Sequence, residues 1–367
     1  MKRARLKDVA EVAGCSIAVV SHVVNNASGN ITCGEYLRQK VLRAAAELGY
    51  TPHYASRALK MQRSFTIGIY IPATYNRNGS LNRETAILDG VERACRELSY
   101  DLLLISLGDG TPASECANKL NERRVDGLIV LHADGDSEWV GQLADSDKNV
   151  VAINYFGAAQ IDRINFNNKA ASAMAVAELA KLNHRKIGYI GPLGDIAPED
   201  ASIRLHGFLE GCAATGIAVN PAMVFDTGAA GTPDVTRTAS GEHETAETIA
   251  SIITATHPDD RPTALVGHSD ASLLLVLREL MRNGLRVPKD ISAIGMDDSF
   301  LCRFFLPELA SVKQPFFEMG EKAARHVIEE SEMRPSNDLR PQTKRERWEQ
   351  IIDPEFIERA SIARREV

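Results

Sequence analysis

Residues 6–26 read LKDVAEVAGCSIAVVSHVVNN, and their apolar spacing predicts two short helices separated by a tight turn. The first helix is expected near 6–13 and the second near 17–25. Gly14 can adopt the positive φ that a sharp turn needs, and Ser16 can cap the second helix by accepting a hydrogen bond from an amide one turn further on. The N-terminus is therefore predicted to be a helix–turn–helix unit.

A third helix is expected to follow. Thr32 and Glu35 match the T-x-x-E pattern of a capping box ahead of YLRQKVLRAAAELGY, and Gly49 is a suitable helix end. Pro52 begins another short helical candidate, HYASRALK. The apolar residues predicted to form the core of this small domain are Val9, Ala10, Ala13, Val20, Val23, Val41 and Leu48.

The charge of the chain is unevenly distributed. The 367 residues carry a formal net charge of −7, but residues 1–63 hold ten Lys and Arg against four Asp and Glu. The rest of the chain is strongly acidic. Because attraction to phosphates requires clustered positive charge, this pattern favours a small nucleic-acid-binding head joined to a larger domain that stays off DNA.

Beyond residue 63 the chain alternates apolar strands with amphipathic helices. Strands are predicted at 66–72, 101–106, 127–131, 149–154, 186–191, 222–226, 263–267 and 292–297. Helices are predicted at 83–98, 113–123, 138–145, 201–215, 242–255 and 270–283. The fold class is therefore α/β, with doubly wound parallel sheets covered on both faces, and the number of strands suggests two lobes.

Motifs of common enzymes and metal sites are missing from the sequence. It contains no GxGxxG, GxxxxGK[ST] or GxSxG, and His243-Glu244 lacks the second His of HExxH. Asp297-Asp298 has no neighbouring His or Glu to complete a metal site. Six scattered cysteines without a CxxC pair suggest neither zinc binding nor a disulfide framework. We expect no enzyme activity, no cofactor and no metal.

The N-terminal residues MKRARLKDVAEVAG contain no apolar run of signal-peptide length, and no stretch of about 18 apolar residues predicts a membrane span. We therefore expect a cytoplasmic protein that does not enter a membrane.

The opening segment, LKDVAEVAGCSIAVVSHVVNN, resembles the DNA-binding head of the LacI/GalR family of bacterial transcription regulators. The likeness continues in order along the chain, through VLRAAAELGYTPHYASRALK, TIGIYIP, HRKIGYIGP, RLHGFLEG, GHSDASLLLVLRELMRNGLRVPKDISAIGMDD and LASVKQP. It implies a helix-turn-helix domain over 1–51, a hinge helix and linker over 52–63, and a periplasmic-binding-protein-like effector-binding and dimerisation domain over 64–367. The implied N-lobe spans about 64–165 and 315–345, and the implied C-lobe about 166–314 and 346–367.

The resemblance also implies which residues contact DNA. Base edges would face Ile17, Ala18 and His22, phosphates would face Ser16, Ser21 and Asn25, and the hinge would contribute Ala55, Arg57 and Leu59, with Leu59 as a minor-groove wedge. Val19 stands where the family usually has Thr, and His22 stands where it usually has Arg. The alternatives are that the polar residues are merely solvated and that Leu59 packs on the core domain.

The implied effector site lies between the lobes. Arg204 and Asp297 match the family positions that clamp the effector, and Phe316 resembles a pocket aromatic. Ser269 stands where the family commonly has Asn, and Tyr75 could offer a stacking face. Alternatively, Arg204 and Asp297 form a purely structural pair, and Phe316 belongs to the core.

Together these features imply a sequence-specific DNA-binding regulator, a repressor rather than an activator. It would bind a palindromic operator as a homodimer, or as a tetramer, under the control of a small molecule that is sugar-like rather than a purine. Two alternatives remain open: a DNA-binding dimer whose core has lost effector binding, and a small-molecule binding protein without a regulatory role.

Overall fold

The computed structural model describes residues 4–24, 33–51, 58, 61–71, 81–107, 111–133, 138–145, 149–194, 199–228, 239–333 and 346–366. The chain forms two compact units, a head that extends to Phe65 and a core that begins at Thr66.

The head consists of α1 (Leu6–Ala13), α2 (Ile17–Val24) and α3 (Glu35–Glu47). The predicted turn between the first two helices is confirmed, because Gly14 has a φ of +65° and the Ser16 hydroxyl accepts a hydrogen bond from the Val19 amide at 3.3 Å. The left-handed helix end at Gly49 is also confirmed, with a φ of +59°.

Two predictions about the head are wrong. Glu35 is the first residue of α3 and Gly34 is its N-cap, so Glu35 is not at the third helical position that a capping box requires. Leu48 is 37% exposed because it follows the last turn of α3, whereas the other predicted core residues are buried. The helices are thus held together by small and β-branched apolar side chains.

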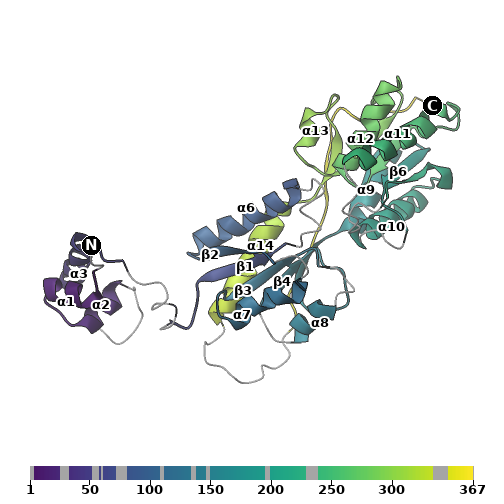
Figure 1. The fold of residues 1–367 in the computed structure, drawn as a ribbon. Helices are drawn as coiled ribbons and strands as arrows, with labels where there is room; N and C mark the ends of the chain where they lie inside the picture. Colours follow the sequence, from purple (N-terminus) through teal and green to yellow (C-terminus); the bar gives the residue numbers. More distant parts are fainter. Residues whose placement is uncertain are drawn as a thin grey trace. The chain divides into compact units, whose positions relative to one another are not determined.

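The core domain has two lobes, each built on a six-stranded sheet (Figure 1). The first sheet has the order β11-β5-β4-β3-β1-β2 and is parallel throughout. Its strands are β1 (Thr66–Tyr70), β2 (Asp101–Ile105), β3 (Gly127–Leu131), β4 (Val150–Ile153), β5 (Asp162–Phe166) and β11 (Glu349–Ile352). Its helices are α6 (Leu81–Glu97), η1 (Ala113–Ala117), α7 (Asn118–Asn121), α8 (Glu138–Asp145) and α14 (Phe316–Met333).

The second sheet has the order β12-β10-β9-β8-β6-β7 and is parallel except for the edge strand β12. Its strands are β6 (Ile187–Gly191), β7 (Val224–Asp226), β8 (Ala264–Gly267), β9 (Ser292–Asp297), β10 (Ala310–Lys313) and β12 (Glu355–Ile357). Its helices are α9 (Asn168–Lys181), α10 (Glu199–Ala214), η2 (Pro221–Met223), α11 (Ala239–Ala255), α12 (Asp270–Arg282) and α13 (Leu301–Phe304). The predicted doubly wound α/β architecture is confirmed.

The chain passes between the lobes three times, and the last crossing comes later than predicted. β11 pairs with β5 through residue 352, so the chain stays in the first lobe beyond the expected boundary at 345. The short β12 strand then belongs to the second sheet. Backbone pairing, rather than hydrophobic pattern, decides this boundary, because β11 is largely exposed.

Glycines let pairs of helices approach closely. A Cβ on Gly90 of α6 would lie 2.0 Å from the Phe317 carbonyl oxygen of α14, and a Cβ on Gly207 of α10 would lie 2.2 Å from the Lys169 carbonyl oxygen of α9. The second contact matters for the site, because it draws the middle of α10, just beyond Arg204, against the start of α9.

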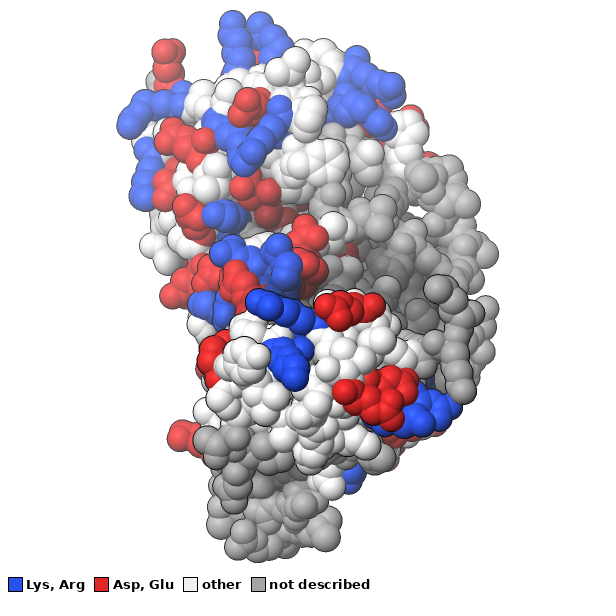
Figure 2. Space-filling model, turned by 90° about the vertical axis from the view of Figure 1, so that its left-hand side faces the viewer, with Lys and Arg blue, Asp and Glu red and all other residues white. Residues whose placement is uncertain are grey.

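On the face shown in Figure 2, basic and acidic side chains are interspersed over the described surface. Among the described residues, no helix is long and apolar enough to cross a membrane.

Candidate functional site

The second helix of the head presents the residues that were predicted to read DNA. Ser16, Ile17 and Ala18 are exposed, with Ile17 at 51%, while Val20 and Val23 on the opposite face are buried in the head. Ser21 and His22 are partly exposed. Val19 is also partly buried and packs on the head core. The helix therefore has one face fixed to the domain and another available for contact.

Several predicted site residues lie outside the described residues: Asn25, Ala55, Arg57, Leu59 and Tyr75. Their proposed roles stay predictions.

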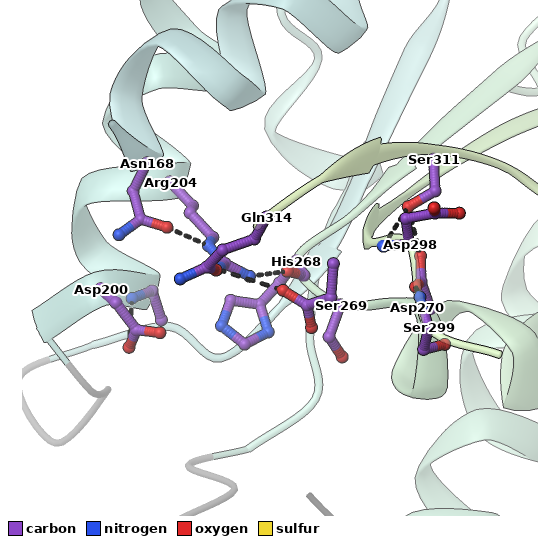
Figure 3. A network of polar contacts seen from close by, with 12 residues as sticks. Asn168, Asp200, Arg204, His268, Ser269, Asp270, Asp298, Ser299, Ser311 and Gln314 are labelled. Atoms are coloured by element: carbon purple, nitrogen blue, oxygen red, sulfur yellow. Dashed lines mark hydrogen bonds and ion pairs between the residues drawn. The ribbon is translucent and has the colours of Figure 1, made fainter. Parts of the chain in front are cut away.

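Arg204 lies at the centre of a polar cluster at the carboxyl ends of the second sheet (Figure 3). Its Nε donates to Asn168 Oδ1 at 2.6 Å, and its Nη1 donates to the His268 carbonyl oxygen. Its Nη2 donates to Asp297 Oδ1 at 3.3 Å and to Gln314 Oε1 at 3.0 Å. We call these five residues the Arg204 cluster.

The elements of the second lobe explain how the cluster assembles. Asp297 is the last residue of β9, His268 follows β8, and Gln314 follows β10. These three residues lie at or just beyond the carboxyl ends of parallel strands, so they meet at one edge of the sheet. Asn168 begins α9, which is held against α10 at Gly207. Asp297 has a φ of +107°, a strained value for a residue with a side chain. Backbone strain of this kind clusters at functional sites.

Burial controls the ionisation of the cluster. Burial raises the pKa of Asp297, and Arg204 opposes that rise. Burial and the charge of Arg204 lower the pKa of His268 to about 3, so its imidazole is neutral at physiological pH. His132, which follows β3 of the first lobe, also has its pKa lowered to about 3, by burial and by the charges of Arg83 and Arg204. Side chains of both lobes therefore act on one electrostatic environment.

Two other predicted effector residues have defined places. The Ser269 hydroxyl accepts from the Ser272 amide at 3.3 Å and lies 2.8 Å from Ser272 Oγ, so it caps α12. Phe316 is buried at the start of α14, two residues after Gln314. Whether either contacts an effector stays a prediction.

Sequence reasoning missed several members of this region. Asn168, His268 and Gln314 each bond Arg204, although none was predicted as a site residue. Asp298, also at a positive φ, forms a buried ion pair with Arg359 near the C-terminus. The sequence feature that could have identified these four residues is their place in the chain, because each lies at or next to the end of a strand or the start of a helix.

A helical head joined to a two-lobed α/β core defines the class of ligand-controlled transcription regulators, and comparisons with known proteins agree. The family model described as bacterial regulatory proteins, lacI family, matches residues 5–53, and the model of a periplasmic binding protein-like domain matches residues 176–362. The ribose operon repressor of Haemophilus influenzae is 30% identical over 333 residues, covering 89% of this chain and 91% of that protein. The repressor PurR of Aliivibrio salmonicida is 29% identical over 329 residues, covering 89% and 92%.

Solved structures share the fold. The lac repressor dimer bound to operator and an anti-inducer has a TM-score of 0.75 at 22% identity, covering 99% of this chain and 100% of that one. A complex of the regulator CelR with cellobiose has a TM-score of 0.65 at 23% identity, covering 98% and 100%.

The chain belongs to the LacI family of bacterial transcription regulators. It is a transcription regulator with a periplasmic-binding-protein-like domain, and this family consists of regulators, not enzymes.

Proposed function

We propose that this chain binds an approximately palindromic operator of about 14–20 base pairs as a homodimer, and that a small sugar-like molecule bound at Arg204 and Asp297 controls this binding. The observation that carries the proposal is the buried Arg204–Asp297 ion pair at the carboxyl ends of parallel strands. Ligands of open α/β sheets bind at such strand ends.

The shape of the head supports DNA reading. A helix with one buried and one exposed face can enter the major groove, where base edges carry a unique pattern of donors and acceptors. Ile17 and Ala18 offer apolar contact suited to a thymine methyl group, and His22 offers a ring nitrogen to a purine N7.

Exposed apolar side chains support the dimer. Phe300, Phe304 and Leu306 around α13 are 54%, 79% and 77% exposed, and clustered apolar surface of this kind marks protein interfaces. The related lac repressor was solved as a dimer on operator. Phe304→Asp and Leu306→Asp should shift sedimentation towards monomer, whereas Ile252→Asp at another exposed position should not.

The chemistry of the pair supports a hydroxylated effector. The guanidinium donates in a fixed fork and the carboxylate accepts, which suits vicinal hydroxyl groups. Relatives include a ribose operon repressor, a cellobiose complex and a family regulator from Enterococcus faecium with bound ribose. Other relatives are repressors named PurR, so purines are the competing effector class to be tested.

The test has two parts. Footprinting on DNA beside the chain's own gene should show a protected palindrome with two protomers bound, and protection by a monomer would contradict the proposal. Calorimetry with sugars and purines should then identify a ligand whose affinity is lost in Asp297→Ala. If no compound binds, the core has lost effector control.

A further inference from the structure

Two polar side-chain atoms, one in the Arg204 cluster and one near it, have no hydrogen-bond partner among the described residues. They are the hydroxyl of Tyr189 and Nε2 of His268, and both are excluded from solvent. Among the described residues, each lacks any donor or acceptor within reach. Such atoms are rare in folded proteins, because a polar group that leaves water without a new partner is destabilising. Their position next to a binding site therefore calls for an explanation.

The Tyr189 hydroxyl and the Cβ of His268 both lie next to Gly191. Tyr189 and Gly191 are two residues apart on β6 and so face the same side of the sheet. A Cβ on Gly191 would lie 3.0 Å from the Tyr189 hydroxyl and 2.6 Å from His268 Cβ. The Tyr189 ring therefore extends along the strand towards its carboxyl end.

Neighbouring bonds fix this arrangement beside Arg204. The His268 amide donates to the Ile190 carbonyl at 2.7 Å, and the His268 carbonyl accepts from Arg204. The Tyr189 ring packs on Phe208 of α10 with ring centroids 5.1 Å apart, one turn beyond Arg204. Both atoms without partners thus lie at the effector end of the second sheet.

The two groups have complementary chemistry. A phenol can donate its hydrogen, and a neutral imidazole donates at one ring nitrogen and accepts at the other. A single ligand hydroxyl can accept from the phenol and donate to an imidazole nitrogen, whereas a purine base needs two different atoms to do both.

We propose that Tyr189 and His268 are specificity-determining residues that together bind a hydroxyl group of the effector, which makes polyhydroxylated, sugar-like compounds the ligand class. This inference rests on the proposed function, namely that the effector binds at Arg204 and Asp297. Because neither atom is open to solvent, the ligand must widen the site as it enters. A ligand can reach the site from the side of His268, because this residue as a whole is partly exposed.

The experiment uses the full chain and a fixed set of probes: D-ribose, 2-deoxy-D-ribose, D-glucose, cellobiose, adenosine and hypoxanthine. Thermal shift and calorimetry are measured for the wild type, Tyr189→Phe, His268→Asn and Asp297→Ala. Tyr155→Phe is the matched control, because its buried hydroxyl accepts from the Ala159 amide at 3.1 Å.

In the ligand-free protein, Tyr189→Phe should leave the melting temperature unchanged or raise it, whereas Tyr155→Phe should lower it, because only Tyr155 loses a hydrogen bond. A hydroxylated probe should bind the wild type, and its affinity should fall about tenfold in Tyr189→Phe and in His268→Asn, which corresponds to one lost hydrogen bond. His268→Asn keeps a polar side chain but has no atom at the position of Nε2.

The failures are distinguishable. If a hydroxylated probe binds the wild type and loses affinity in Asp297→Ala but not in Tyr189→Phe and His268→Asn, the inference is overturned and the proposed site stands. If binding survives Asp297→Ala, the proposed site is wrong. Binding of hypoxanthine alone, or of none of the hydroxylated probes, overturns the inference.

Discussion

Arg204 and Asp297 form an ion pair at 3.3 Å although their side chains are only 1% and 9% exposed. Buried charges are tolerated when each is paired and hydrogen-bonded, and here Asn168 and Gln314 occupy further donors of the guanidinium. These contacts together fix the orientation of the Arg204 guanidinium in the site.

Removal of one partner should leave a buried charge uncompensated. We expect Arg204→Ala to lower the free energy of unfolding of the core by about 3–5 kcal/mol in a denaturant titration. Lys313→Ala is the control, because the Lys313–Glu355 pair at 3.0 Å is exposed and should contribute about 1 kcal/mol or less. Equal losses in the two variants would show that burial does not set the strength of the Arg204 pair.

Asp270 should make stability depend on pH. Burial and the nearby Asp297 raise its pKa in the folded protein to about 7. Between about pH 4 and pH 7 the folded state therefore holds a proton that the unfolded state has lost, so stability falls as the pH rises through this window. Asp270→Asn keeps an acceptor for the Ser299 amide, which donates at 2.7 Å to Asp270, and should be more stable than the wild type at pH 8 by about 1–3 kcal/mol.

The opposite sign is expected at Asp290. The hydrogen bond from Arg286 lowers the pKa of Asp290 to about 2, so its stabilising effect is present above pH 4 and is lost as the pH falls towards 2. Asp290→Asn should thus be slightly less stable than the wild type at pH 8. Unfolding curves from about pH 2 to pH 8 would check both variants, and a gap between wild type and Asp270→Asn that does not shrink at low pH would contradict the assignment.

Close helix packing makes Gly90 sensitive to a single methyl group. Gly90→Ala would place a Cβ 2.0 Å from a backbone oxygen of α14, so α6 or α14 must move. We expect a loss of about 1–3 kcal/mol in unfolding free energy. Gly141→Ala in α8 meets nothing within 4 Å and should be neutral or stabilising by up to about 1 kcal/mol. A stable Gly90→Ala protein would mean that the two helices can slide apart at little cost.

Only two of the six thiols should react in the folded protein. Cys15 and Cys33 are partly exposed in the head, whereas Cys95, Cys116, Cys212 and Cys302 are buried in the core. Titration with an aromatic disulfide reagent should modify two thiols in buffer and six in denaturant, and Cys15→Ser or Cys33→Ser should each remove one. Burial raises the pKa of Cys15, so its reaction should be faster at pH 9 than at pH 7. Rapid modification of a core thiol would contradict the burial.

The sequence by itself determined the order of elements wherever hydrophobic period and turn residues agreed. The turn at Gly14, the cap at Ser16 and the eight predicted strands depend on neighbours within a few positions, and the structure has an element at each of them. Where the pattern was weak, prediction failed. β5, β10, β11 and β12 were not predicted because they are short or carry polar residues, and α9 was not predicted because Asn168 and Ser172 lie on its buried face. α14 was not predicted either, although its buried residues Phe316, Met319, Ala323 and Val327 follow helical spacing.

Tertiary structure alone decided the site. Arg204 and Asp297 could be proposed from motifs, but the other bonds of Arg204 reach Asn168 and Gln314, which lie 36 and 110 positions away. The same is true of Tyr189 and His268, since only the fold places both residues next to Gly191 and leaves the Tyr189 hydroxyl and His268 Nε2 without partners among the described residues. Local sequence encodes periodicity and caps, whereas hydrogen-bond satisfaction in a buried site depends on which strand ends the sheet order places next to one another.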